Sequence, residues 1–211
     1  MAASANVASW YRIPEITLKD YVKCLAPLYK VLEQKHTSKG EDDVFMKSIL
    51  MSHGGMTAEA WTFAEKQRRY EKALTMKMGD FHEELAGKFA GYETLPVGHA
   101  TGCDVRKLDD SEFWEWKNRD NTMNSGSAAT VVAKLKAIQE SGKQAFLVMV
   151  NTEKARAPRP TGMPAEVKVM TGKEAYAHLS GRPTFFDDLH ATIDATFQKY
   201  KTHAELVAAL R

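Results

Sequence analysis

The chain has 211 residues, of which 44% are hydrophobic and 27% are charged, and its formal net charge at pH 7 is +2. These values are typical of a globular domain with a sizeable core, and the near-neutral charge by itself neither favours nor excludes nucleic acid as a partner. No apolar run approaches the ~20 residues needed to span a bilayer, and residues 1–10 lack the basic and apolar regions of a secretory signal. The two cysteines, Cys24 and Cys103, are too few for a disulfide scaffold. We therefore expect an intracellular, cytoplasmic protein with free thiols and no membrane contact.

The N-terminal part of the chain is predicted to be helical. We expect residues 1–56 to form a helical extension and residues 57–211 to form the main body with a helical tail. Thr17 can cap the first helix, which Pro27 would kink or divide. A second, shorter helix is predicted over residues 43–52.

A long helical run begins at Thr57 and is predicted to stop at Gly79. Asp80 would then start a new helix, with Glu83 as its capping-box partner three residues later. In this interpretation the Glu83 carboxylate caps a helix end.

The middle of the chain alternates between strands and helices. A helix after residue 125 has apolar residues at helical spacing, and the run QAFLVMV is short and almost wholly apolar, as in a buried strand. The predicted strands lie near residues 92–95, on both sides of a turn at 109–110, and at 144–150 and 166–170. This order of elements predicts an α/β fold with a mixed central sheet flanked by helices.

The most informative stretch is the predicted β-hairpin with its turn at Asp109 and Asp110. A two-residue loop there places Asp104 directly opposite Glu115. Directly opposed side chains hold their Cβ atoms ~5 Å apart, and like charges so placed repel each other. An ordinary hairpin gains nothing from this arrangement, whereas a hairpin that binds a divalent cation between the two carboxylates is stabilised by it.

The second strand of this hairpin has two different faces. Alternate side chains share a face, so Phe113, Glu115 and Lys117 point one way while Trp114 and Trp116 point the other. The strand is therefore predicted to have an apolar back that packs in the core and a charged front.

The charged front fits the chemistry of phosphodiester hydrolysis. Two carboxylates suit Mg²⁺, which prefers oxygen ligands and retains several waters. Lys117 lies on the same side as Glu115 and can orient an attacking water or neutralise developing negative charge. The triplet of an acid, any residue and lysine also occurs by chance, and a solvated salt bridge is then its usual explanation.

With Asp104, the triplet EWK at 115–117 and the run KNRDNTMNS at 117–125, the chain resembles the PD-(D/E)XK nucleases. More narrowly, it resembles the type II restriction endonucleases that cut GGNCC or GGWCC sites. The closest match covers residues 80–139, and a weaker likeness extends through the segments VMVNTEK and SGRPTFFDDL. One departure is that Cys103, and not proline, precedes the aspartate.

The resemblance implies a restriction-endonuclease-like core and Mg²⁺ as cofactor, with Mn²⁺ able to substitute. It implies that Asp104 and Glu115 are metal ligands and that Lys117 is the catalytic lysine. Glu83 is a candidate third metal ligand, and its role in a capping box is the alternative.

The resemblance also directs attention to side chains that could contact DNA. Asparagine can pair with adenine and arginine with guanine in the major groove, and a helix N-terminus can bind phosphate. The candidates are Asn118, Arg119, Asn121, Asn124, Ser125 and Ser127 after the catalytic strand, and Lys154, Arg156 and Arg159 in a later proline-rich loop. The alternatives are that the Asn and Ser side chains cap the next helix and that the basic loop is merely solvated.

The predicted function is Mg²⁺-dependent, sequence-specific double-strand cleavage of DNA. Palindromic sites imply a two-fold symmetric protein, so we expect a homodimer with helices outside the core at its interface. Two alternatives compete with this prediction. One is a repair nuclease or resolvase of the same fold, and the other is a DNA-binding protein without catalysis.

Overall fold

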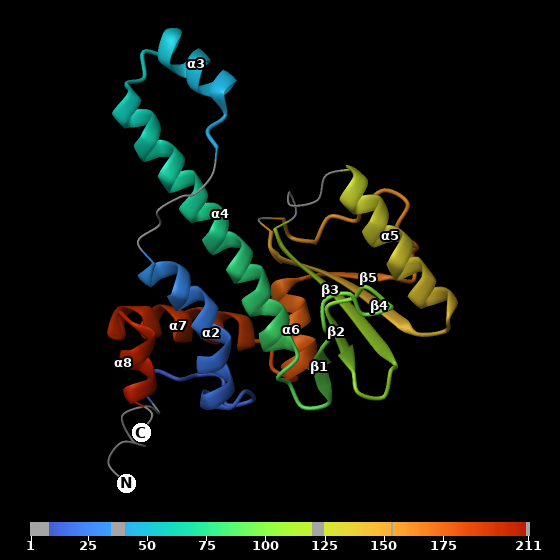
Figure 1. Cartoon of the computed structure of the whole chain (residues 1–211). Coiled ribbons are helices and arrows are strands. Elements are labelled where there is room, and N and C mark those ends of the chain that lie inside the picture. The colour runs from blue at the N-terminus through green and yellow to red at the C-terminus, as the bar shows by residue number, and fades with distance from the viewer. Residues whose placement is uncertain (1–8, 35–40, 120–124, 153, 210–211) are drawn as a thin grey trace.

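The computed structural model of the chain describes residues 9–34, 41–119, 125–152 and 154–209. Its centre is a mixed five-stranded sheet in the order β1-β2-β3-β4-β5 (Figure 1). The strands are β1 (Tyr92–Thr94), β2 (Val105–Lys107), β3 (Glu112–Arg119), β4 (Gln144–Asn151) and β5 (Lys168–Thr171). The predicted mixed sheet with flanking helices is therefore confirmed.

The first three strands are antiparallel and the last two continue parallel to β3. A connection between parallel neighbours must cross the sheet, and helix α5 (Ser125–Glu140) provides it between β3 and β4. In the hairpin, Val105 pairs with Trp114 and Arg106 with Phe113. This register is the predicted one, and Asp104 directly precedes the first paired residue of β2.

The sheet carries an apolar core on each face. On one face Trp114 and Trp116 of β3 pack with Phe146 of β4 and with helices from both ends of the chain. On the other face Phe113 packs with Leu135 of α5 and its apolar neighbours. The two predicted faces of β3 are therefore confirmed.

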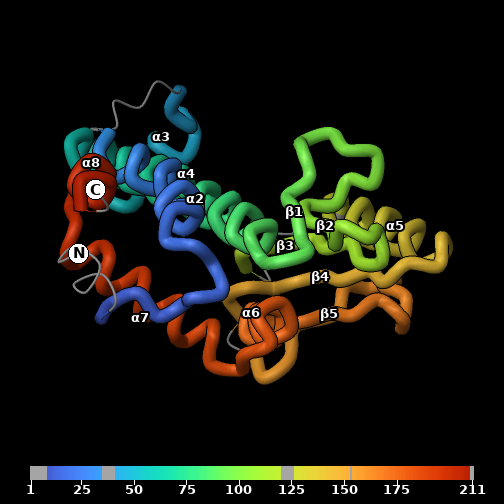
Figure 2. The backbone as a smooth tube through the Cα atoms, turned by 90° about the horizontal axis from the view of Figure 1, so that it is seen from below, coloured from blue at the N-terminus to red at the C-terminus, as the bar shows by residue number. Residues whose placement is uncertain are grey.

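The described residues form seven helices. The others besides α5 are α2 (Leu18–Glu33), α3 (Val44–Ser52), α4 (Ala58–Ala86), α6 (Gly172–Ser180), α7 (Phe185–Lys199) and α8 (His203–Ala208). Figure 2 shows α6 and α7 on one side of the sheet and α5 on the opposite side. None of the helices in these described segments is long and apolar enough to cross a membrane.

Two sequence expectations, that Gly79 ends a helix and that Pro27 divides one, are wrong. Helix α4 is continuous through Gly79, so Asp80 does not cap a new helix and instead pairs with Lys77 at 2.7 Å. Pro27 lies inside α2 and does not divide it. A glycine in a helix interior costs only about 1 kcal/mol, which the apolar contacts of Phe81 and Leu85 in the core can offset.

The helical character predicted for residues 1–56 is present in α2 and α3, but the two helices differ in their packing. Helix α2 contributes Tyr21, Leu25 and Leu28 to the main core. Helix α3 has no buried residue. It lies with the first turns of α4 at the end of an arm that projects from the body (Figure 1).

Candidate active site

The hairpin places Asp104 against the backbone of β3. The Asp104 amide donates to the carbonyl of Trp114 at 2.9 Å, and the Trp116 amide donates to Oδ2 of Asp104 at 2.7 Å. The two β3 residues in these contacts directly precede and follow Glu115 in the sequence. The local pairing of the hairpin therefore fixes the relative positions of the two predicted carboxylates.

Glu115 is the most enclosed acid of the site, with only 2% of its side chain exposed. Its Oε1 lies 2.6 Å from the ammonium of Lys117, which is on the same face of β3. Its Oε2 forms a second ion pair with the ammonium of Lys134 on α5. The predicted neighbours Glu115 and Lys117 are thus brought together, and a second lysine joins them.

Lys134 has no counterpart among the residues predicted from the sequence. Its ammonium also donates to the Gly102 carbonyl at 2.5 Å, and only 19% of its side chain is exposed. It therefore links α5 to Glu115 and to the segment that leads into Asp104. The sequence signal for it is faint: Lys134 directly precedes Leu135, which packs on the core, so it lies at the border of the buried face of α5.

We expect Lys134→Met to destabilise the metal-free protein by about 2 kcal/mol, because it leaves a buried carboxylate with one partner fewer. Denaturant unfolding in the presence of a chelator measures this loss. The matched control is Lys136→Met, since Lys136 lies on the same helix and pairs at 3.8 Å with the exposed Glu140. Equal stabilities of the two variants would show that Lys134 does not hold the site together.

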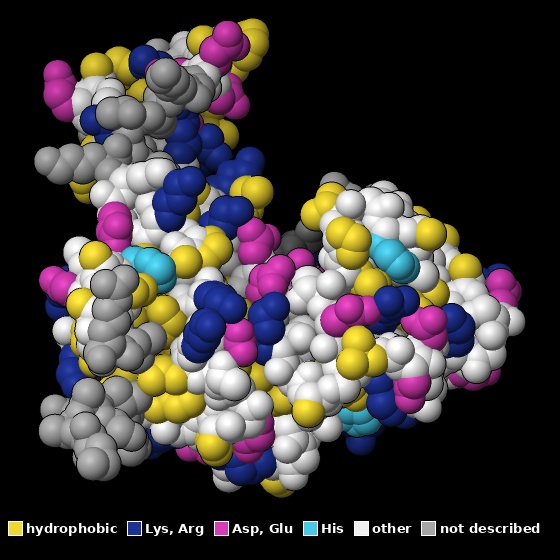
Figure 3. Space-filling view, turned by 60° about the horizontal axis from the view of Figure 1, so that its bottom comes forward, with side chains coloured by type: hydrophobic (Ala, Val, Ile, Leu, Met, Phe, Trp, Pro, Cys, Tyr) yellow, Lys and Arg dark blue, Asp and Glu magenta, His cyan; other side chains and the backbone are white. Residues whose placement is uncertain are grey.

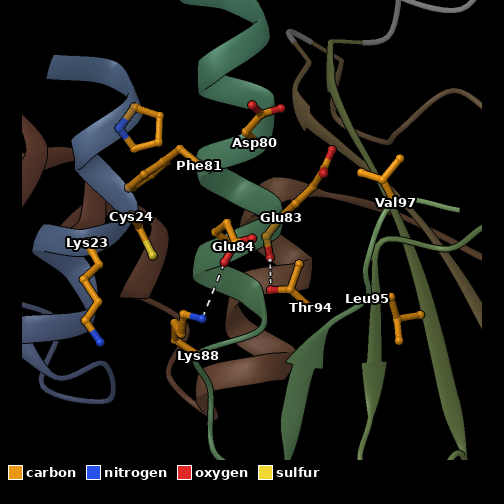
Figure 4. A pocket seen from close by; sticks show the side chains of 11 residues that line it. Lys23, Cys24, Asp80, Phe81, Glu83, Glu84, Lys88, Thr94, Leu95 and Val97 are labelled. Atoms are coloured by element: carbon orange, nitrogen blue, oxygen red, sulfur yellow. Dashed lines mark hydrogen bonds and ion pairs between the residues drawn. The ribbon is translucent and has the colours of Figure 1, made fainter. Parts of the chain in front are cut away.

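Glu83 approaches the same site from α4. Figure 4 shows its side chain extending from α4 toward the strands, while the neighbouring Glu84 turns back to Lys88. Glu83 also lines a cavity of about 470 Å³ together with Asp80 and Val97. The continuity of α4 removes the capping-box alternative for Glu83 and leaves its carboxylate available to the site.

Two carboxylates of the site, Asp104 and Glu83, have a raised pKa. Burial, with the charges of Glu115 and Glu83, raises the pKa of Asp104 to about 7. Burial also raises the pKa of Glu83, an effect that Lys117 opposes and Glu115 reinforces. For Lys117, burial alone would lower the pKa, but Glu115 and Asp104 hold it above its ordinary value. The site therefore holds three acidic side chains and only two lysines, and this excess of negative charge favours binding of a further cation.

The donor set fits a magnesium ion with few protein ligands. Within the described segments no group of three or more acids, histidines and cysteines is arranged around one point as a ready metal site. Asp104 nevertheless lies near enough to Glu115 for their charges to interact, and Mg²⁺ is commonly held by one or two carboxylates and several waters. These two residues could hold such an ion, with Glu83 nearby.

Two predicted DNA-contacting side chains have contacts within the protein. The Asn151 amide donates to Oδ1 of Asn118 at 2.8 Å, which ties the ends of β3 and β4 together. Arg159 donates to the carbonyls of Pro164 and Val167 and so closes its own loop. Neither contact excludes DNA, but both side chains also have a structural role.

The remaining DNA candidates are only partly described. Arg119, Lys154 and Arg156 are exposed, and so is Ser127 in the first turn of α5. Ser125 is the first residue of α5. Asn121 and Asn124 lie outside the described residues.

An acidic, lysine-containing site on a mixed sheet flanked by helices is consistent with a nuclease. A family model described as Eco47II restriction endonuclease matches residues 15–202, and the chain belongs to this family. It is therefore a type II restriction endonuclease, a site-specific enzyme that acts on double-stranded DNA. The type II restriction enzyme Sau96I of Staphylococcus aureus is 27% identical to it over 198 residues, which cover 82% of this chain and 75% of that enzyme.

Proposed function

We propose that the enzyme is a PD-(D/E)XK nuclease whose cleavage depends on Mg²⁺ held by Asp104 and Glu115, with Glu83 as a third acid. The observation that carries this proposal is that Glu115 pairs with Lys117 at 2.6 Å while Asp104 accepts from the Trp116 amide between them. When bound, Mg²⁺ supplies positive charge to a phosphoryl oxygen and acidifies a nearby water.

The protein's own side chains then have distinct roles in our proposal. Glu115 holds the ammonium of Lys117 at 2.6 Å, and this fixed charge can orient the attacking water or stabilise the phosphate as negative charge develops. The backbone contact from Trp116 fixes one oxygen of Asp104. Lys134 acts through Glu115 and is a positioning residue.

The DNA is proposed to contact the segment that follows β3 and the basic loop after β4. Arg119 is the last residue of β3 and Ser127 lies in the first turn of α5, while Lys154 and Arg156 carry the positive charge of the later loop. Side chains that reach base edges give sequence specificity, whereas contacts to phosphates give affinity and register. A homodimer would present two such surfaces to the two halves of a palindromic site.

Sequencing the ends of plasmid DNA incubated with the protein and Mg²⁺ tests this proposal. We expect every break to lie at one short palindromic motif, and we expect a chelator to abolish cleavage and Mn²⁺ to restore it. Breaks at junctions or nicks without a common motif would favour the structure-specific nuclease. Undiminished cleavage in the chelator would contradict the metal-dependent mechanism.

A further inference from the structure

Helix α3 has large hydrophobic side chains that no other described part of the protein covers. Large hydrophobic side chains are exposed on α3 and on the adjoining end of α4, and we call this surface the α3 tip: Val44, Phe45, Met46, Ile49, Met51 and Phe63. Phe45 is 80% exposed, and no residue of α3 is buried. Helices with apolar side chains on most of their surface are normally covered.

The position of the α3 tip prevents the rest of the described chain from covering it. Figure 1 shows α3 at the far end of the arm, away from the sheet. Figure 3 shows hydrophobic side chains among charged ones at this end of the molecule. Among the described residues none covers the α3 tip, and its place at the end of the arm leaves it accessible to a second molecule.

Polar contacts fix α3 on α4 and leave its apolar side chains pointing outward. The indole of Trp61 donates to Asp42 at 3.1 Å, directly before α3. Arg69 of α4 donates to the Glu41 carbonyl at 3.1 Å and pairs with Asp42 at 3.5 Å. These contacts tie the start of α3 to α4.

We propose that the α3 tip packs against the α3 tip of a second copy of the chain across a two-fold axis. The exposed fractions of its six side chains, multiplied by full areas of about 150–250 Å² for large residues, give an exposed area of ~700 Å². A standard interface buries ~800 Å² per partner, which is of similar size. A patch on a two-fold axis meets its own copy, so one apolar patch is sufficient. This inference rests on the proposed homodimer and assigns its interface.

A pair of matched variants tests the assignment by light scattering coupled to size exclusion, without DNA or metal. The wild type is expected to have twice the 23.6 kDa mass of one chain. Ile49→Glu places a charge in both halves of the interface and should weaken association at least ~100-fold. The control is Leu108→Glu, an isomeric side chain with 60% exposure, against 63% for Ile49, at the hairpin turn. It should leave the dimer intact.

A cross-link supplies a second measurement that removes no apolar surface. Cys24 and Cys103 are free and buried, so a thiol introduced by Ser48→Cys on exposed α3 is the one that should react. A short bismaleimide should join two Ser48→Cys chains and should not join two Ser141→Cys chains, whose thiol lies at the far end of α5.

Each of these measurements tests the interface through association of the chains and not through DNA cleavage. A monomeric wild type, or a dimer that Ile49→Glu weakens no more than Leu108→Glu does, would overturn the proposal. If Ile49→Glu fails to fold, as judged by circular dichroism, the Ser48→Cys cross-link decides. A wild type that is dimeric but does not cleave DNA with Mg²⁺ would instead count against the proposed metal site.

Discussion

Glu115→Gln is expected to reduce Mg²⁺-dependent DNA cleavage by at least ~10³-fold while DNA binding persists. The substitution keeps the shape of the side chain but removes the charge that would hold the metal and that pairs with Lys117 and Lys134. Cleavage rates under single-turnover conditions measure the first effect. Fluorescence anisotropy of a labelled duplex in Ca²⁺ measures the second.

The matched control is Glu140→Gln, since Glu140 lies on α5 and is 66% exposed. Its cleavage rate should stay within a factor of two to three of the wild type, as is usual for a surface substitution. If Glu115→Gln still cuts DNA at the wild-type rate with Mg²⁺, the site assignment is wrong. If it loses both cleavage and duplex binding, the loss reports misfolding and not chemistry.

The hairpin could be predicted from the sequence because its geometry is local. A two-residue turn sets the register of both strands, and the period of two sets their faces. The observed pairing of Val105 with Trp114 is the register that the predicted turn gives, although residues 108–111 lie between the two strands and the Asp110 amide donates to the Lys107 carbonyl. The sequence alone therefore predicts that Asp104, Glu115 and Lys117 lie close together.

The features that the sequence did not predict depend on contacts between distant segments. Lys134 meets the Gly102 carbonyl across 32 residues of chain, and no local pattern encodes that contact. Gly79 was expected to end a helix from its intrinsic propensity. The burial of Phe81 and Leu85 in the main core outweighs this preference, because tertiary packing routinely overrides propensity.

The second large effect concerns Asp104 and pH. Because the pKa of Asp104 is raised to about 7, the folded state binds a proton more tightly than the unfolded state does. The stability of the metal-free protein should therefore decrease as pH rises from about 4 to about 7, the window between the usual aspartate pKa and the raised one. Asparagine resembles the protonated acid, so Asp104→Asn should stabilise the metal-free protein at pH 8 by on the order of 2 kcal/mol.

Urea unfolding at pH 5 and pH 8 in a chelator measures this difference. Asp109→Asn on the same hairpin is the control with the opposite sign, since the Ser111 hydroxyl lowers the pKa of Asp109. That variant should be slightly less stable than the wild type at pH 8. A destabilised Asp104→Asn protein at pH 8 would contradict the crowding of acids on which the cation site depends.

Bound metal should reverse the relative stability of the wild type and Asp104→Asn. A cation that binds the ionised acids stabilises the folded state by an amount that grows with the logarithm of its affinity, and a proton on Asp104 competes with it. The affinity of the wild type for Mn²⁺, measured by calorimetry, should therefore decrease roughly tenfold per pH unit below about 7. Asp104→Asn should lose most of this affinity and its pH dependence.

Glu83→Gln should shift the pH dependence of Mn²⁺ affinity to lower pH, because the charge of Glu83 helps to raise the pKa of Asp104.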